Sequence, residues 1–416
     1  MRKTDSGRYD VLVVGAGAAG LACAGDLGTA GLRVRLLEAD GAVGGRMRTD
    51  RVAGFTVDRG FQVFNTSYPQ VKRRIDLKAL RLRPFTPGVL VHTQDGLRRL
   101  TDPVRRPKES RDLLPGRLVS GRDLLALGAL SARDTLAPAS VLRRRPDGTT
   151  LTALAQAGVS PHLVETFFRP FLSGVFLEDE LTTSARFFHL VWRSMLRGTL
   201  CLPAEGIGAV PAQLASRLPV DVLRTDSPVT AVTRDGVVVA DGSHVQARAV
   251  VVATGQRVAA ELLPGLRVPE GRTVTTLYHA TAGPPLTEPV LVVDSRRRFL
   301  NTCVLTAVHP HFSADGRALV STSLLGSPGP AETEAVLPAL GEVYGADTAD
   351  WELVHRVTVP DALPAMPGPV PLSRSTRFGP GRYVCGDHRA TGSLQGALAS
   401  GARAAREVLQ DLDGSS

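Results

Sequence analysis

The chain has 416 residues, too many for one simple core, so we expect two structural domains. Hydrophobic residues make up 43% of the chain and charged residues 21%, which is typical of a soluble globular enzyme. The formal net charge of +9 comes almost entirely from arginine. No recognition-helix pattern, zinc pair or aromatic-rich RNA motif accompanies the arginines, so we expect no nucleic-acid partner.

The four cysteines are far apart and form no CxxC pair; they are Cys23, Cys201, Cys303 and Cys385. This spacing supports neither a disulfide framework nor a metal site, and it fits a reducing cytosol. No apolar run of about 20 residues exists, so we expect no spanning helix. Arginines gather in residues 98–111, 143–145 and 296–298, which indicates either attraction to anionic headgroups or a solvated basic face. We expect a cytoplasmic protein and leave peripheral membrane association open.

The stretch from Tyr9 to Asp40 predicts a strand, a tight turn and a helix. Val11–Val14 form a continuous apolar run, as in a parallel strand buried on both faces. Gly15, Gly17 and Gly20 follow as GxGxxG. The first glycine permits the turn, the second lets the backbone approach a diphosphate, and the third lets helix and strand pack closely. The diphosphate would rest on the helix N-terminus, at Ala18 and Ala19.

The helix continues with apolar residues at helical spacing, and residues 33–37 form a second strand closed by Glu38. A carboxylate at this distance from the glycines can bind both ribose hydroxyls of an adenosine. Strand, glycines, helix, strand and acid in this order predict a dinucleotide site. A glycine-rich loop without a ligand would leave Glu38 unexplained.

The next residues, "GAVGGRMRTD" (41–50), add Gly44, Gly45 and Arg46. The run from residue 10 to 50 resembles the extended FAD motif of the flavin amine oxidase, phytoene desaturase and protoporphyrinogen oxidase superfamily. The resemblance implies non-covalent FAD, with Gly45 and Arg46 against its diphosphate and flavin. Residues 54–64 are similar to the segment that follows in those families, which implies that Gly60 and Phe61 lie close to the flavin ring.

The remaining order implies an α/β, Rossmann-like FAD-binding domain interleaved with an α+β substrate-binding domain, the two-domain amine oxidase and desaturase architecture. We expect the FAD-binding domain in residues 1–75, 200–265 and 356–416. The substrate-binding domain then takes residues 76–199 and 266–355, with one helix around 331–343. Its aromatic cluster at 167–192 would either line an apolar substrate cavity or form plain core. Residues 227–255 read as a β-meander, in which the resemblance places Val229 against the adenine side of FAD.

"GRYVCGDHRATGSLQGALASGARAAREVL" (381–409) predicts a short strand, a tight turn at Gly386 and Asp387, and a helix from Ser393 to Leu409. The small residues at the helix start would give clearance to a flavin ring on the helix N-terminus. The resemblance gives Asp387 the ribityl–diphosphate part of FAD. Backbone amides near Leu394 and Gln395 would face the flavin O2.

Two departures from the amine oxidases favour a different branch. Ser393 stands where those enzymes typically place an aromatic residue, and no lysine follows Lys108 to bridge through water to flavin N5. The C-terminal motif resembles more closely the plant-type phytoene desaturase and hydroxysqualene dehydroxylase branch. The resemblance implies an apolar substrate, isoprenoid or polycyclic.

The mechanism implied is hydride transfer from a substrate C–H bond to flavin N5, with FAD carrying the chemistry. Because no second GxGxxG follows, the acceptor would be oxygen, a quinone or another carrier. Candidate proton-transfer residues are His388 and Arg389, then His279 and Arg169, each with a structural role as the alternative. Three alternative functions stay open: a flavin-dependent isomerase of a carotenoid-like substrate, a flavin-binding sensor, and a disfavoured amine oxidase. The oligomeric state has no signal in the sequence.

Overall fold

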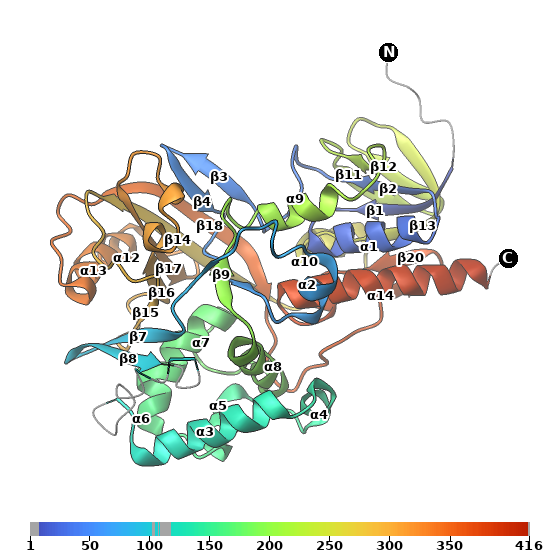
Figure 1. Cartoon of the computed structure of the whole chain (residues 1–416). Helices are drawn as coiled ribbons and strands as arrows, with labels where there is room; N and C mark the ends of the chain where they lie inside the picture. The colour runs from blue at the N-terminus through green and yellow to red at the C-terminus, as the bar shows by residue number, and fades with distance from the viewer. Residues whose placement is uncertain (1–7, 102–104, 107, 109–117, 415–416) are drawn as a thin grey trace.

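The computed structural model describes residues 8–101, 105, 106, 108 and 118–414. Residues 102–104, 107 and 109–111 of the first arginine cluster lie outside this part of the chain. Two large sheets, a lobe of helices and a long C-terminal helix dominate the architecture (Figure 1).

The first sheet has eight strands in the order β10-β2-β1-β13-β12-β11, with β20 added beside β13 and β19 beside β20. Its parallel centre forms because apolar runs such as Val11–Val14 bury both faces. The strands are β1 (Tyr9–Val14), β2 (Val34–Leu37), β10 (Leu223–Arg224), β11 (Val229–Thr233), β12 (Gly236–Val239), β13 (His244–Val252), β19 (Arg377–Gly379) and β20 (Arg382–Val384). Strands β11, β12 and β13 form the predicted antiparallel meander.

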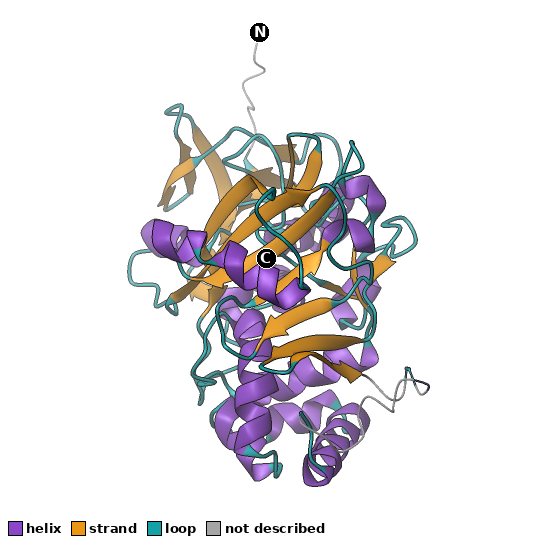
Figure 2. Cartoon of the chain, turned by 90° about the vertical axis from the view of Figure 1, so that its left-hand side faces the viewer, coloured by secondary structure: helices purple, strands orange, loops and turns teal. Residues whose placement is uncertain are grey.

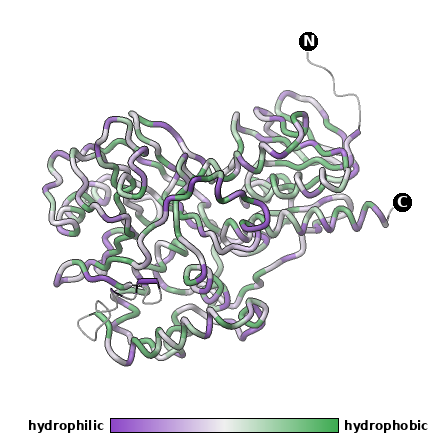
Figure 3. Tube along the Cα trace, in the orientation of Figure 1, coloured by the Kyte–Doolittle hydropathy of each residue, from purple (hydrophilic) through white to green (hydrophobic). Residues whose placement is uncertain are grey.

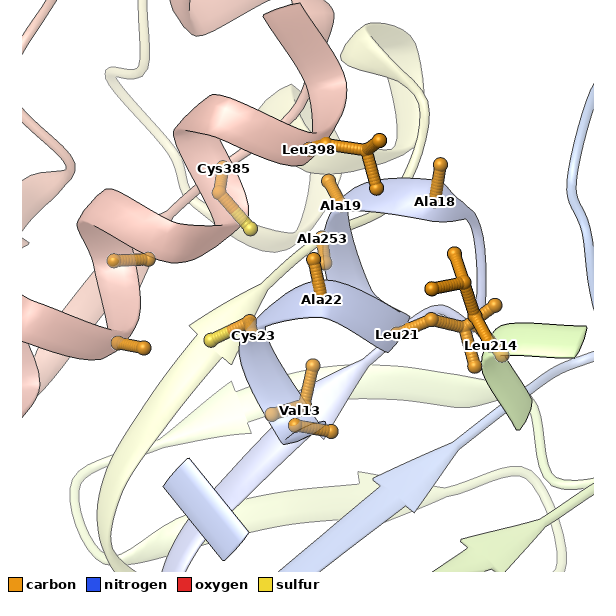
Figure 4. Close-up of a cluster of buried hydrophobic side chains, with 14 of the residues drawn as sticks. Val13, Ala18, Ala19, Leu21, Ala22, Cys23, Leu214, Ala253, Cys385 and Leu398 are labelled. Carbon is orange, nitrogen blue, oxygen red and sulfur yellow. The ribbon is translucent and has the colours of Figure 1, made fainter. Parts of the chain in front are cut away.

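Helices α1 (Ala18–Thr29), α9 (Ala209–Ala215) and α14 (Leu394–Asp413) contribute to the core on one face of this sheet. Figure 4 shows the small side chains of α1, including Ala19, Ala22 and Cys23, below Leu398 of α14. α10 (Gln256–Leu262) packs on the opposite face, in a core that includes Leu12 and Val250. The chain's first helix and its last helix therefore lie side by side, as Figure 1 also shows.

The second sheet has seven strands in the order β18-β14-β17-β16-β15-β7-β8. They are β7 (Gly88–Thr93), β8 (Gly96–Thr101), β14 (Gly271–Thr281), β15 (Leu291–Asp294), β16 (Asn301–Val304), β17 (Ala318–Leu325) and β18 (Glu352–Pro364). One core of this sheet includes α13 (Val336–Tyr344), which follows α12 (Pro330–Glu334) in place of the single predicted helix. β18 runs eight residues beyond the boundary expected at 356, because it stays paired with β14 as far as Pro364.

The helical lobe lies below the strands in Figure 2. It consists of α3 (Gly121–Leu136), α4 (Ala139–Arg144), α5 (Thr150–Gln156), α6 (Pro161–Leu163), the π-helix η2 (Val164–Phe168), α7 (Arg169–Phe176) and α8 (Ala185–Arg197). The aromatic cluster fills its core: Phe168 and Phe188 are fully buried, with ring centroids 6.4 Å apart. Of the two interpretations of this cluster, the structure supports core packing.

Shorter elements connect these parts, and two small sheets lie among them: β3 with β4, and β5-β9-β6. Their bounds are β3 (Thr49–Val52), β4 (Phe55–Asp58), β5 (Phe64–Asn65), α2 (Pro69–Arg74), β6 (Arg83–Pro84), β9 (Leu200–Leu202), α11 (Leu305–Val308), η3 (Pro310–Phe312) and η4 (Asp387–Arg389). Hydrophobic and hydrophilic residues alternate along the trace (Figure 3), and no helix in the described residues is long and apolar enough to cross a bilayer.

Candidate functional site

The glycine turn between β1 and α1 has three different steric environments. Gly15 has φ +100°, in the left-handed region that favours glycine. A Cβ on Gly20 would lie 1.9 Å from the Gly15 carbonyl oxygen, so helix and turn touch there. A Cβ on Gly17 would have no atom within 4 Å. The turn is therefore tight at Gly15 and Gly20 and open at Gly17, as a diphosphate site requires.

The N-terminus of α1 faces the same opening. Its N-cap, Gly17, offers no side chain to the first-turn amides at Ala18 and Ala19. Gly45 crosses beside the turn in a left-handed conformation, φ +58°, and a Cβ there would lie 3.7 Å from the Gly17 Cα. Uncapped amides, the helix dipole and glycine backbone together make a cradle that fits a diphosphate.

Glu38 lies where the sequence places it, directly after β2. Its carboxylate accepts hydrogen bonds from the Ala16 amide, at 2.6 Å, and the Asp40 amide, at 3.1 Å. The chain around Val229 is attached to the same corner, because the Ser227 amide donates to the Glu38 carbonyl at 2.8 Å. A buried carboxylate at the strand end, next to the glycine turn, fits a ribose.

Arg46 connects this end of the site to the C-terminal motif. Its Nη2 lies 2.7 Å from Asp387 Oδ1, and its Nη1 donates to the Ala362 carbonyl at 2.6 Å. Burial acts to lower the pKa of Arg46, but the buried Asp387 carboxylate outweighs burial and the pKa is raised. This ion pair fixes Gly45 and Gly386, which the sequence places 341 positions apart, at one location.

The C-terminal helix begins one residue later than predicted, at Leu394, and extends to Asp413. Ser393 is its N-cap and accepts from the Gly396 amide at 3.1 Å. In the described residues, no protein acceptor is paired with the amides of Leu394 and Gln395, which stay available to a ligand. The Gln395 side chain instead holds the Gln70 amide, at 2.9 Å.

The small residues of this helix make close contacts with protein atoms. A Cβ on Gly396 would lie 1.8 Å from the Thr391 carbonyl oxygen, and one on Gly392 would lie 3.2 Å from Pro364. Gly401, farther along, would meet the Ala19 carbonyl oxygen at 2.1 Å. The glycines therefore permit protein backbone and loop to approach the helix. Clearance for a flavin ring at the helix start stays a prediction.

A small cavity lies where the segment of Gly60 and Phe61 meets the second sheet. Its lining is mainly apolar and aromatic: Thr56, Asp58, Phe61, Leu202, Tyr278, Leu305 and Phe312. The Phe61 amide donates to Thr276 Oγ1 at 3.2 Å, and the Tyr278 hydroxyl donates to the Asp58 carbonyl at 2.6 Å. These two bonds attach the predicted flavin segment to β14.

Asp58 is the acidic residue of this cavity. Its Oδ1 accepts from Thr49 Oγ1 at 2.6 Å and from the Ile207 amide at 2.9 Å. Burial raises the pKa of this carboxyl to about 6, and the two hydrogen bonds oppose the rise. Asp58 can therefore gain or lose a proton near neutral pH.

None of the four predicted proton-transfer residues lines this cavity. Both ring nitrogens of His388 are enclosed by protein without a hydrogen-bond partner, and burial lowers the pKa of this imidazole to about 4. Arg389 donates to the Ser375 carbonyl at 2.6 Å, and Arg169 pairs with Glu165 at 2.8 Å. His279 packs beside Trp351, with ring centroids 6.4 Å apart, on the face of β14 opposite Tyr278.

Strand alternation in the sequence indicates which residues of β14 share the face of Tyr278. In a strand, alternate residues face the same side. Thr276, Tyr278 and Ala280 therefore share the face of β14 that meets Phe61, and His279 belongs to the other face. Among the described residues, no cluster of three or more His, Cys, Asp or Glu side chains could hold a metal.

A glycine turn with open helix amides, a buried acid at the end of β2 and a second sheet attached at Phe61 are the features of an FAD-dependent oxidoreductase. Residues 18–409 match the family described as flavin containing amine oxidoreductase, and the chain belongs to that family. FAD is accordingly its cofactor, and the residues of the cradle fit that group.

Solved structures share this fold. An oxidoreductase from Methanosarcina mazei is 17% identical, with 96% of this chain and 100% of that chain covered and a TM-score of 0.73. Cyclohexylamine oxidase from Brevibacterium oxydans is also 17% identical, with 98% and 100% covered and a TM-score of 0.71. Protoporphyrinogen oxidase 2 from Arabidopsis thaliana is 42% identical over 71 residues, which is 17% of this chain and only 14% of that protein.

Proposed function

We propose that the protein oxidises a C–H bond of an apolar substrate, of the isoprenoid or polycyclic kind, in the manner of the phytoene desaturase and hydroxysqualene dehydroxylase branch. Bound FAD would take the hydride at N5 and pass the electrons to oxygen, a quinone or another carrier. The observation that carries the proposal is the pair of departures from the amine oxidases, Ser393 in place of an aromatic residue and the absence of lysine after Lys108. The side chains of Phe61, Tyr278 and Phe312 are candidate walls of the substrate site. The cavity among them has a volume of about 10 Å³, the space of about one water molecule, so a substrate of this kind requires these side chains to move apart.

In this proposal the protein's residues have three roles: they bind the cofactor, they form the wall of the cavity, and they hold a proton. The cradle at Gly17, Glu38 and Arg46 binds the cofactor. Tyr278, held by the Asp58 carbonyl, and Phe61, held by Thr276, keep the wall of the cavity in place and limit the access of water. Asp58, with a pKa raised to about 6, is the group in this wall that can hold or release a proton.

Amine oxidation is the second candidate, because Asp58 places a carboxyl in the cavity and carboxylates pair with ammonium groups. Against it stand Ser393, in place of an aromatic residue, and the absence of lysine after Lys108. In both candidates the substrate would lie beside Asp58, and the two candidates differ in the charge of that substrate.

Anaerobic mixing of the FAD-loaded protein with candidate substrates separates these functions. We expect an apolar isoprenoid or polycyclic compound to bleach the oxidised flavin absorbance, while primary amines leave it unchanged. Bleaching by amines alone would overturn the proposal in favour of amine oxidation. Product formed without bleaching, and only after prior reduction of the flavin, would show a non-redox isomerase instead.

Tyr278→Phe provides a matched test of the cavity. The substitution removes the hydroxyl that donates to the Asp58 carbonyl but keeps the aromatic ring. If the cavity binds the substrate, the rate of bleaching should fall while FAD content and the thermal midpoint stay close to those of the unmodified protein. An unchanged rate would exclude this wall from the substrate site.

A further inference from the structure

Strand β18 has a bulge where it passes the nucleotide cradle. Its register with β14 shifts between Arg272 and Val274, so that residues 360–362 of β18 stand opposite one residue of β14. Within this bulge Asp361 has φ +52°, in the left-handed region that residues other than glycine rarely adopt. A bulge changes the direction in which a strand presents its groups, and bulges and strained backbone recur beside functional sites.

The bulge presents two carbonyl groups to Arg46. Arg46 Nη1 donates to the Ala362 carbonyl at 2.6 Å and lies 3.2 Å from the Asp361 carbonyl oxygen. The other terminal nitrogen, Nη2, lies 2.7 Å from Asp387 Oδ1. Burial acts to lower the pKa of Arg46, and the carboxylates of Asp387 and Asp361 both act to raise it. The guanidinium is therefore held by the C-terminal motif at one nitrogen and by the second sheet at the other.

The side chain of Asp361 attaches the bulge to α10, which meets β18 in the middle of the molecule (Figure 1). Gln256 of α10 is 6% exposed, and its Nε2 donates to Asp361 Oδ1 at 3.3 Å. The Arg257 guanidinium lies 3.8 Å from Asp361 Oδ2. A Cβ on Gly271 would lie 1.6 Å from Asp361 Oδ1, so a glycine at this position of β14 leaves the carboxylate its place.

Residue type alone does not account for these contacts. Aspartate tolerates the left-handed region better than most residues, which would suffice for an ordinary bulge. It would not require a buried amide such as Gln256 to hold the carboxylate, or a glycine opposite it. Because the conformation is strained and is also held from two neighbouring elements, it has a use beyond the turn itself.

We propose that Asp361 is a positioning residue for the cofactor, which aims the carbonyls of the bulge at Arg46 and so fixes the guanidinium that the FAD meets. Gln256 and Gly271 keep Asp361 in the required conformation. Asp361 acts through Arg46 and needs no contact with FAD of its own. The inference adopts the predicted contact between Arg46 and FAD, and it does not depend on the proposed substrate.

Titration of the apoprotein with FAD, followed by flavin fluorescence, tests three substitutions of Asp361. Asp361→Ala loses the link to Gln256 and disfavours the left-handed backbone, so it should raise the dissociation constant roughly 10-fold. Asp361→Gly accepts the backbone conformation but lacks the carboxylate, so it should raise the constant by a smaller factor, roughly threefold. Asp361→Asn keeps an oxygen acceptor and tolerates the conformation, so it should stay within roughly twofold of the unmodified protein.

Two further variants separate the position of the carboxylate from its charge. Gly271→Ala displaces the Asp361 carboxylate without removing it, and should weaken FAD binding about as much as Asp361→Ala. The matched control is Glu261→Ala, which removes an exposed carboxylate of α10 that pairs with Arg257 at 3.0 Å. This control should leave the dissociation constant unchanged.

A double-mutant cycle separates positioning from a merely structural role. In an Arg46→Gln background no guanidinium remains to be aimed, so adding Asp361→Ala should weaken FAD binding no further. Equal losses in both backgrounds would overturn the proposal, as would unchanged binding by Asp361→Ala. Weakening by Asp361→Asn as large as that by Asp361→Ala, or by Glu261→Ala as well, would show an effect of charge instead. If Asp361→Ala does not fold, Asp361→Gly in the two backgrounds gives the same comparison.

Discussion

The nucleotide cradle and the cavity below β14 are built on opposite principles. The cradle is shaped by missing side chains: a Cβ on Gly17 would meet no atom within 4 Å, and Gly20 lets the helix touch the turn. The cavity is shaped by side chains that are present, among them Asp58 and Tyr278, which are 220 residues apart in the chain. The cradle is a local feature of backbone, whereas the cavity is a long-range assembly of side chains. Substitutions should therefore damage the two regions by different mechanisms.

The largest effect should follow from filling the tight side of the cradle. Gly20→Val places atoms where the Gly15 carbonyl oxygen already lies, 1.9 Å from the new Cβ. Because both partners are backbone, we expect a loss of at least about 3 kcal/mol in the free energy of unfolding, together with loss of bound FAD. Urea unfolding and the flavin absorbance of purified protein measure both quantities. A folded variant with full FAD content would show that the cradle is not sterically closed.

Substitution at the cavity should change how the free energy of unfolding depends on pH. Since burial raises the pKa of Asp58 from 3.8 to about 6, the folded state binds this proton more tightly than the unfolded chain. Below about pH 4 the carboxyl is protonated in both the folded and the unfolded state, and its burial costs nothing. Above about pH 6 it is ionised in both states, and its burial lowers the free energy of unfolding by about 3 kcal/mol. Asp58→Asn keeps an oxygen acceptor for Thr49 and Ile207, so its stability relative to the unmodified protein should rise between these values. Urea unfolding across this range measures the difference.

An exposed acid with the opposite shift is the control for this prediction. Backbone and side-chain hydrogen bonds from Arg317 lower the pKa of Asp315 from 3.8 to about 2. The stability that Asp315 contributes is present above about pH 4 and is lost as pH falls toward 2. Asp315→Asn should thus change the free energy of unfolding only in the acidic part of the pH profile. A pH-independent difference for Asp58→Asn would show that its carboxyl ionises without penalty.

Glu38→Ala tests the predicted ribose end of the cradle, where a side chain is expected to contribute to FAD affinity. Loss of its hydrogen bonds should weaken FAD binding by about 10- to 100-fold, equivalent to about 1.4–2.8 kcal/mol. Titration of the apoprotein with FAD, followed by flavin fluorescence, measures the dissociation constant. Asp40→Ala, which removes a neighbouring exposed carboxylate paired with Arg48, should leave it unchanged. Equal weakening by both variants would indicate a general charge effect.

The smallest effect should come from a glycine of α1 whose Cβ position has no close neighbour. A Cβ on Gly28 would meet no atom within 4 Å, and its position lies inside the helix. Gly28→Ala should raise the free energy of unfolding by about 0.4–1 kcal/mol, because it restricts the unfolded chain. FAD affinity should not change. Destabilisation here would mean that open space at a glycine does not predict tolerance, which would weaken the interpretation of Gly17 as well.

The two regions also differ in what the sequence could predict. The strand–turn–helix at residues 9–40 and the C-terminal motif are contiguous, so glycine spacing and hydrophobic pattern were sufficient to predict their elements. Fold class, FAD and oxidoreductase activity are confirmed by the fold and the family match. The assignments of individual cofactor-binding residues and of domain boundaries stay predictions.

The remaining features depend on pairing across long distances, which a single sequence does not encode locally. Nothing near Asp58 indicates that Tyr278 will contact it. His279 is a candidate by residue type alone, whereas strand alternation decides that Tyr278 is the side chain that reaches the cavity. The pairing of β18 with β14, some eighty residues earlier in the chain, carries the second sheet past residue 356 as far as Pro364, and no local pattern near 356 indicates this.

The packing of α14 on α1 has a consequence for synthesis. The helix that covers the first turn of the cradle is synthesised more than 350 residues after that turn, and Gly401 must reach the Ala19 carbonyl before that contact exists. Until then, residues 9–40 can form their strands and helix but lack a cover over one face. The nascent chain must therefore keep an apolar surface out of contact with other proteins while more than 350 residues are added. Cofactor loading is expected to follow the synthesis and docking of α14, and to be sensitive to changes in residues 394–413.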